Sequence, residues 1–193
     1  MTPAVPCLRH WRGWVGTAEA DGWLRTLLEE VPWKQESVSV YGRRHPMPRL
    51  TCWMADPGCG YRYAGLKNAI EPWTPLTAAI RRRVAAVADR PFHSLLLNLY
   101  RDGRDAMGWH ADDEAELDPH APIASLSLGA SRTLRFRPCR RGTAPTLAVD
   151  LGHGDLLLMD PPTQRHWQHQ LPRRLKVDAP RVNLTFRAMR VPP

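Results

Sequence analysis

The chain has 193 residues, of which 43% are hydrophobic, and a formal net charge of +8. This length predicts one domain with a substantial core. The sequence has no signal peptide and no apolar run long enough to cross a bilayer, which argues against a membrane protein. The basic excess favours a polyanionic partner such as nucleic acid. Because only Lys34, Lys67 and Lys176 are lysines, part of the arginine bias could instead be genomic.

The cysteines predict free thiols in a reducing compartment. Cys7, Cys52, Cys59 and Cys139 contain no Cys-x-x-Cys pair. A zinc site at Cys52 and Cys59 lacks completing ligands nearby. We therefore expect a cytoplasmic protein, associated with the nucleoid if it is bacterial.

The N-terminal part predicts an arm and two helices. Residues 1–16 are rich in Pro and Gly and predict an irregular arm. Thr17 is a candidate cap for a helix over 18–30, whose apolar residues recur at helical spacing. Thr74 followed by Pro75 predicts the start of a second helix, which ends near Asp89.

Between these helices the pattern favours extended structure. Residues 38–41 alternate as a strand does and lead into the basic, turn-rich stretch 42–49. Residues 51–54 and 61–63 are further extended pieces. This region predicts a hairpin with an exposed basic tip.

From residue 94 onward the chain predicts short strands separated by turns. At least seven are expected, over 94–100, 123–129, 132–137, 145–151, 154–159, 164–170 and 181–189. Such a series is typical of a two-sheet jelly roll or barrel. With the helices outside it, the fold class is α+β.

A candidate metal site lies at His110 and Asp112. On a strand, residues two apart face the same side, so both side chains can reach one ion. Two ligands on one element plus a distant His form the two-His-one-carboxylate triad that holds Fe(II). His166 and His169 are candidates for the third ligand, and their spacing alone does not choose between them.

The last predicted strand carries a polar face made by Arg181, Asn183, Thr185 and Arg187. One interpretation is an ordinary half-exposed strand. The other is a polar barrel interior, in which a guanidinium binds a carboxylate bidentately and neighbouring amide or hydroxyl groups share the anion. A small diacid could then chelate the iron at one end and be anchored at the other.

These elements resemble the AlkB family of Fe(II)- and 2-oxoglutarate-dependent nucleic-acid dealkylases. The resemblance covers 94–190 and rests on five segments: 98–100, His110-Ala111-Asp112, 122–129, 154–159 and, most specifically, 181–187. It implies a double-stranded β-helix (jelly-roll) core over 94–193. It also implies that 17–93 holds the two flanking helices and a β-hairpin nucleotide-recognition lid, within one dioxygenase domain over 17–193.

The resemblance also implies residue roles. His110, Asp112 and His169 would be the catalytic metal ligands for Fe(II). Arg181 and Arg187 would grip the carboxylates of 2-oxoglutarate, Arg187 on the distal one. Other co-substrate contacts would come from Asn98 and Tyr100, with Asn183 and Thr185 on the same polar face.

The implied reaction consumes O2 and 2-oxoglutarate and oxidises an N-alkyl group on a base, which is lost as an aldehyde. The target base must leave the stack. Glu114 would read that base, Tyr63 would stack on it with Tyr61 beside it, and Tyr41 would fill the gap in the duplex. Arg49 and the cluster at 173–176 are candidate phosphate contacts.

The predicted function is therefore direct-reversal repair of N-alkylated DNA by a monomer acting on double-stranded DNA. Lesions of the 1-methyladenine and 3-methylcytosine type are expected, with etheno adducts as further candidates. The alternatives are an oxygenase acting on RNA, protein or a small metabolite, and a nucleic-acid-binding module with an inactive site. Glu114, the aromatic residues and the charge argue against a protein, lipid or small-metabolite substrate but do not distinguish RNA from DNA, and the complete triad argues against an inactive binding module.

Overall fold

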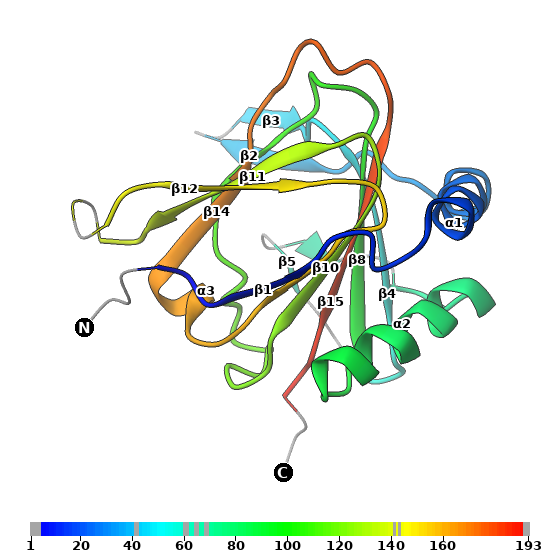
Figure 1. Cartoon of the computed structure of the whole chain (residues 1–193), viewed down its shortest axis with the longest axis horizontal. Coiled ribbons are helices and arrows are strands. Elements are labelled where there is room, and N and C mark those ends of the chain that lie inside the picture. Colours follow the sequence, from blue (N-terminus) through cyan, green and yellow to red (C-terminus); the bar gives the residue numbers. More distant parts are fainter. Residues whose placement is uncertain are drawn as a thin grey trace.

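Two sheets face each other at the centre of the computed structural model (Figure 1). The structure describes residues 5–40, 43–59, 62–63, 66–67, 70–140, 142 and 144–190. The larger sheet has seven strands in the order β1-β13-β10-β15-β8-β4-β7, and the smaller has four in the order β12-β11-β14-β9. This arrangement confirms the predicted jelly-roll core.

The larger sheet is antiparallel except where β4 and β7 pair in parallel. Its strands, in spatial order, are β1 (Leu8–Trp11), β13 (Leu156–Met159), β10 (Ile123–Gly129), β15 (Arg181–Arg187), β8 (Ser94–Tyr100), β4 (Leu50–Ala55) and β7 (Ile70–Glu71). The limits of β8 and β10 are those predicted from sequence. Nearly every residue of these two strands is buried, as expected for strands that are covered on both faces.

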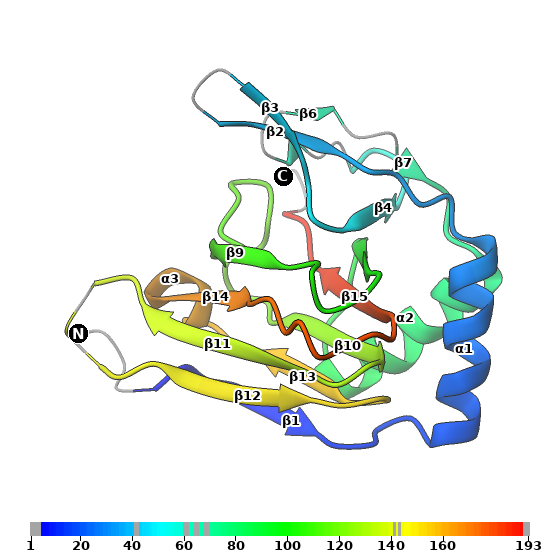
Figure 2. The same ribbon diagram turned by 90° about the horizontal axis from the view of Figure 1, so that it is seen from above.

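Two helices cover the outer face of this sheet, α1 (Thr17–Glu30) and α2 (Pro75–Ala88) (Figures 1 and 2). Leu27 of α1 and Ile80 and Val84 of α2 join the core formed by the outward side chains of the strands. Alternation then sends the other side chains of β8 and β15 toward the smaller sheet. The polar face of β15 is consequently interior, which decides between the two interpretations of that strand.

The helix ends follow the predicted chemistry at α2 and depart from it at α1. Thr74 caps α2, because its hydroxyl accepts a hydrogen bond from the Thr77 amide at 3.1 Å. Thr17 is instead the first residue of α1, and Gly16 occupies the cap position without a side-chain bond. Within the described residues, no helix is both long and apolar enough to span a membrane.

The smaller sheet consists of β12 (Leu147–Leu151), β11 (Arg132–Pro138), β14 (Trp167–Leu171) and β9 (Met107–His110). Burial alternates along β11 and β14, so one face of this sheet turns inward and the other meets solvent. The inward face packs with residues of β8, β10 and β13 into a second core cluster. The space between the two sheets therefore holds an apolar cluster and, where β15 passes, a group of polar side chains.

The region between the helices contains two short hairpins. β2 (Ser37–Val40) pairs with β3 (Arg43–Pro46), and β5 (Arg62–Tyr63) pairs with β6 (Leu66–Lys67). Figure 2 shows β2, β3 and β6 together along one side of the molecule, beyond β4. A hairpin is thus present, but Arg43–Pro46, expected within a turn-rich loop over 42–49, form its second strand, and its tip at 41–42 lies outside the described residues.

Two further local expectations were wrong. Residues 8–11, predicted as part of an irregular arm, form β1 at the edge of the larger sheet, where they pair with β13. The predicted strand over 164–170 begins as the short helix α3 (Thr163–His166), and only Trp167 onward is extended. Both features depend on partners distant in the chain, which a local pattern does not contain.

A close approach of two loops gives a stability prediction. A Cβ atom at Gly103 would lie 1.9 Å from the Arg174 carbonyl oxygen and 2.9 Å from that of Val177. We expect Gly103→Ala to lower the free energy of unfolding by about 1–3 kcal/mol, because the loop backbones must separate. Gly22→Ala, in open space on α1, should instead stabilise by up to about 1 kcal/mol. Urea unfolding of both variants tests this, and equal effects would contradict it.

Candidate metal and co-substrate site

Three potential metal ligands converge between the sheets. His110 is the last residue of β9, and the register of the β9–β14 pair sets it opposite His169. Asp112 follows two residues after His110, beyond the end of the strand. One ligand atom from each of the three residues lies within 4.8 Å of the others. The prediction that they share one ion is consistent with this geometry, although Asp112 reaches it from a loop rather than from a strand.

The protonation states of the two imidazoles are those that metal coordination requires. Nδ1 of His110 lies 2.9 Å from the Gly108 carbonyl oxygen, which can only accept, so Nδ1 carries the proton and Nε2 keeps its lone pair. Nε2 lies 4.0 Å from the Asp112 carboxylate. Burial lowers the pKa of His169 to about 3, an effect that His110 reinforces, so this ring is neutral at physiological pH.

The carboxylate of Asp112 is held in its charged form. Its residue is only 4% exposed. Burial, the largest single effect, raises the pKa of Asp112, but the charge and hydrogen bond of Arg187 together with the two neighbouring histidines more than offset it and leave the pKa at about 2. Arg187 donates a 2.7 Å hydrogen bond to this carboxylate, and Arg187 is itself 1% exposed. The pair is therefore a fixed anionic ligand and its cationic support.

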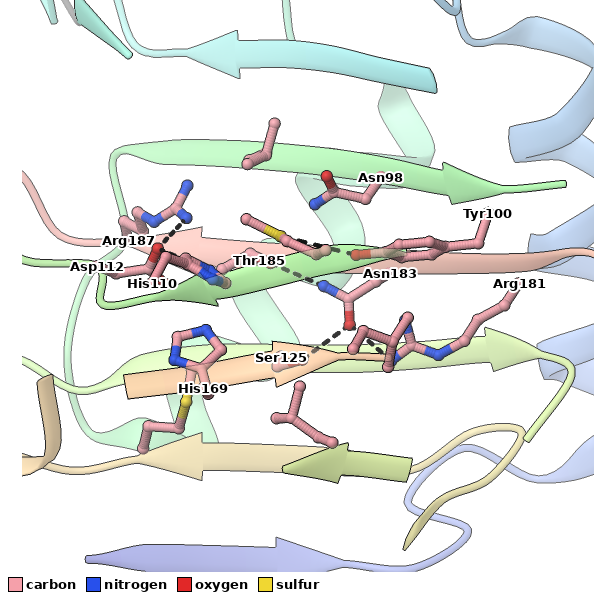
Figure 3. Close-up of a pocket in the computed structure, with 15 residues that line it drawn as sticks. Asn98, Tyr100, His110, Asp112, Ser125, His169, Arg181, Asn183, Thr185 and Arg187 are labelled. Atoms are coloured by element: carbon pink, nitrogen blue, oxygen red, sulfur yellow. Dashed lines mark hydrogen bonds and ion pairs between the residues drawn. The ribbon is translucent and has the colours of Figure 1, made fainter. Parts of the chain in front are cut away.

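A polar pocket extends from these ligands along β15 (Figure 3). Arg181 stands at the far end, where it donates to Ser127 and to the Asn183 amide oxygen at 2.8 and 3.0 Å. Asn183 in turn donates to Thr185 at 2.7 Å. Burial lowers the pKa of Arg181 to about 10, which still leaves it charged. A row of donors thus leads from the metal ligands to a buried guanidinium.

The strand β8 supplies the other predicted pocket residues. Asn98 and Tyr100 both line the pocket. The Tyr100 ring lies 5.5 Å from the Arg181 guanidinium. Arg49, predicted as a phosphate contact, is instead 5% exposed and donates to Asn98 at 2.8 Å. Its charge is directed inward, so the prediction for Arg49 was wrong.

Sequence reasoning missed the contribution of β10. Ser125 donates a hydrogen bond to the Asn183 amide oxygen at 2.8 Å, and the Ser127 hydroxyl accepts one from Arg181. Their alternation with leucine and alanine along 123–129 was visible in the sequence. Only the pairing of β10 with β15 turns that alternation into part of the pocket.

The predicted substrate residues are described in part. Glu114 is half-buried and lines a cavity of about 590 Å³ together with Asp112. Its Oε2 atom is buried, with no hydrogen-bond partner among the described residues. Tyr41 and Tyr61 lie outside the described residues, and for Tyr63 only the backbone, in β5, is described.

The site fits a divalent transition metal with a small dianion. Two neutral imidazoles and one carboxylate are the donor set of the facial triad, which leaves further coordination positions open. The Nδ1 atom of His169 is buried and has no hydrogen-bond partner within the described part of the chain. Arg181 also keeps a buried Nε–H without a partner among those residues. An anion between the two ends would therefore find both a metal and an unused donor.

Comparisons with known proteins agree with this chemistry. Residues 7–187 match the model of the 2OG-Fe(II) oxygenase superfamily. The chain is 45% identical over 181 residues to the DNA oxidative demethylase ALKBH2 of Mus musculus, with 89% of this chain and 76% of that protein covered. The chain belongs to the AlkB family.

One further relative and one solved structure are also similar to this chain. The alpha-ketoglutarate-dependent dioxygenase alkB homolog 3 of Homo sapiens is 38% identical, over 92% of this chain and 64% of that protein. The solved structure of OsALKBH1 superposes with a TM-score of 0.64 at 18% identity, covering 95% of this chain and 98% of that one. This last match supports the fold alone. As an AlkB family member, the chain uses Fe(II), 2-oxoglutarate and O2.

The low pKa of His169 gives a prediction for the metal-free protein. In the unfolded chain this His binds a proton near pH 6.5, whereas in the fold it does so only near pH 3. Because the unfolded state then binds more protons, unfolding free energy should fall as pH drops through this range. The loss should reach up to about 1.4 kcal/mol per pH unit.

Urea unfolding in the presence of a chelator, at a series of pH values, measures this slope. His169→Asn removes the titrating ring, so its stability should depend less steeply on pH between 6.5 and 3. Parallel curves for the two proteins would rule out a buried, neutral His169.

Proposed function

We propose that this protein is an Fe(II)- and 2-oxoglutarate-dependent DNA oxidative demethylase that repairs N-alkylated bases. The observation that carries the proposal is the His110–Asp112–His169 triad, of which Asp112 and His169 are buried, joined by one pocket to a buried arginine. The 45% identity to a DNA oxidative demethylase over 89% of the chain supports DNA as the substrate. Bases of the 1-methyladenine and 3-methylcytosine type are the proposed targets, with etheno adducts as further candidates.

In this proposal, His110, Asp112 and His169 hold the iron. When bound, Fe(II) with 2-oxoglutarate and O2 supplies the oxidation of the N-alkyl carbon, which leaves as an aldehyde while the diacid loses carbon dioxide. The protein contributes position and charge. The Arg187 guanidinium keeps Asp112 ionised, and the surrounding apolar residues of both sheets exclude water from the pocket.

We propose that the two arginines have the opposite roles to those expected from the sequence. Arg187 lies against Asp112 at the metal end of the pocket, so it is not available for a carboxylate at the distal end. Arg181, at the opposite end and flanked by Ser127 and Tyr100, has the geometry of the distal anchor. We therefore assign the distal carboxylate of 2-oxoglutarate to Arg181, and its metal-chelating end to the neighbourhood of Arg187.

The nucleic acid would approach from the side of the hairpins and of Glu114. The buried Oε2 of Glu114 needs a donor, and the amino group of a flipped base provides one. Tyr63 and Tyr61 are the proposed stacking residues, and Tyr41 the proposed wedge in double-stranded DNA. The exposed basic loop at 173–176 is suited to phosphate contacts. We propose that the protein acts on duplex DNA as a monomer in the cytoplasm.

The distal anchor is tested by Arg181→Gln. Loss of a charge-assisted hydrogen bond costs about 1.5–3 kcal/mol, so the 2-oxoglutarate concentration at half-maximal rate should rise roughly 10- to 150-fold. Arg135→Gln, an exposed arginine on the outward face of β11, is the matched control and should leave that concentration unchanged. An unaltered 2-oxoglutarate requirement in Arg181→Gln would refute the anchor.

The substrate class is tested with oligonucleotides that carry 1-methyladenine, 3-methylcytosine or an etheno base. The purified protein with Fe(II) and 2-oxoglutarate should restore the normal base, which mass spectrometry detects. Asp112→Ala should abolish the reaction. Turnover of 2-oxoglutarate with RNA, a protein or a small metabolite, and none with DNA, would replace this function by the alternative oxygenase activity.

The wedge is tested by comparing duplex and single-stranded substrates. Tyr41→Ala should reduce repair of duplex DNA more than repair of single strands, because only the duplex has a stack to fill. Rates measured on both forms of one methylated oligonucleotide provide the comparison. Equal losses on the two forms would count against a wedge at this position.

A further inference from the structure

One side chain of the short helix α3, that of Gln164, contacts Asp112, the proposed carboxylate ligand of the metal. Gln164 accepts a hydrogen bond from the Asp112 backbone amide at 3.0 Å through its Oε1 atom. Because a backbone N–H can only donate, the amide orientation of Gln164 is fixed by this contact. Its Nε2 atom faces the sulfur of Met159 at 3.4 Å, and Met159 lines the polar pocket.

The main chain at Asp112 needs such support. β9 ends at His110, and the paired register of β9 and β14 does not extend beyond it. Residues 111–114 have no regular structure. The carboxylate is held by Arg187, but that bond does not fix the peptide from which the side chain departs. The contact from Gln164 does, and it comes from an element 52 residues away in the chain.

The helix that carries Gln164 is itself anchored. The Thr163 hydroxyl accepts from the Cys7 amide and donates to the Cys7 carbonyl, both at 3.0 Å. The Asp160 amide donates to the same carbonyl at 2.9 Å. Arg9 of β1 adds a two-bond ion pair to the Asp160 carboxylate. The N-terminal strand therefore fixes the turn from which Gln164 reaches Asp112.

We propose that Gln164 is a positioning residue for the metal centre, which orients Asp112 by holding its backbone amide. The inference rests on the proposed role of Asp112 as a metal ligand. Groups that hold a ligand in place typically change metal affinity by about 10- to 100-fold when they are lost. Gln164 lines the cavity that also contains Glu114 but does not reach the ion in this proposal, so metal affinity, measured without nucleic acid, is the readout that isolates its effect on Asp112.

The experiment is a calorimetric titration of the metal-free protein with Mn(II), which needs no turnover. Gln164→Met keeps the length of the side chain but removes the acceptor, and it should weaken Mn(II) binding about 10- to 100-fold. Gln164→Glu keeps an acceptor oxygen at the same reach and should recover most of the affinity. Gln170→Met makes the same chemical change on the outward face of β14, next to His169, and should bind as the unaltered protein does.

The possible outcomes distinguish failure of the positioning role of Gln164 from failure of the proposed metal-dependent function. If the unaltered protein binds Mn(II) and Gln164→Met binds equally well, the positioning role is overturned and the metal site stands. If the unaltered protein binds no metal, the proposed function itself fails. Thermal unfolding of each metal-free variant controls for folding. Should Gln164→Met not fold, Gln164→Asn, which shortens the side chain by one methylene, must show the same loss.

Discussion

The pairing of β14 with β9 is the constraint on which the rest of the site depends. Its register brings His169 opposite His110, with ring centroids 4.1 Å apart. A shift by one residue would turn one imidazole to the outer face of the sheet, since side chains alternate along a strand. The pairing of β11 with β14 secures this register from the other side. Backbone hydrogen bonds of the smaller sheet thus set the separation of two metal ligands before any ion is present.

The charge of the pocket favours binding of the metal ion and the dianionic co-substrate together. Arg181 and Arg187 are both buried, and Asp112 is the one carboxylate among the residues that line the pocket. A divalent metal ion would add further positive charge to a region of low dielectric. A dianionic co-substrate compensates that charge and supplies acceptors to the donors along β15. Binding the metal and the diacid in the same pocket therefore balances the charge better than binding either one alone.

The N-terminal strand links the periphery of the fold to this pocket. β1 adds to the edge of the larger sheet, and the contacts of Cys7, just before it, with Thr163 and of Arg9 with Asp160 hold the turn that precedes β14. The same turn carries Gln164 toward Asp112 and leads directly into Trp167 and His169. Segments from the two ends of the chain consequently cooperate in placing side chains for the metal. The strands β2, β3 and β6 of the hairpins lie away from this turn, along the side of the molecule beyond β4 (Figure 2).

The sequence by itself determined the elements whose signals are local. Periodicity gave β8, β10 and β15, the Thr74–Pro75 pair gave the start of α2, and the spacing of His110 and Asp112 gave two of the ligands. Five motif segments in order, of which 181–187 is the most specific, indicated the family. These features succeed because alternation, capping and short motifs are properties of neighbouring residues.

Only the tertiary structure decided the features that depend on which segments meet. It made the polar face of β15 interior, directed Arg49 toward Asn98, and put Arg187 rather than Arg181 beside Asp112. It also showed that His166 ends a helix while His169 lies within the strand, which distance along the chain did not reveal. The physical reason is the same in each case. A side chain's direction follows from local backbone geometry, but what it meets there is set by pairings between strands far apart in the sequence.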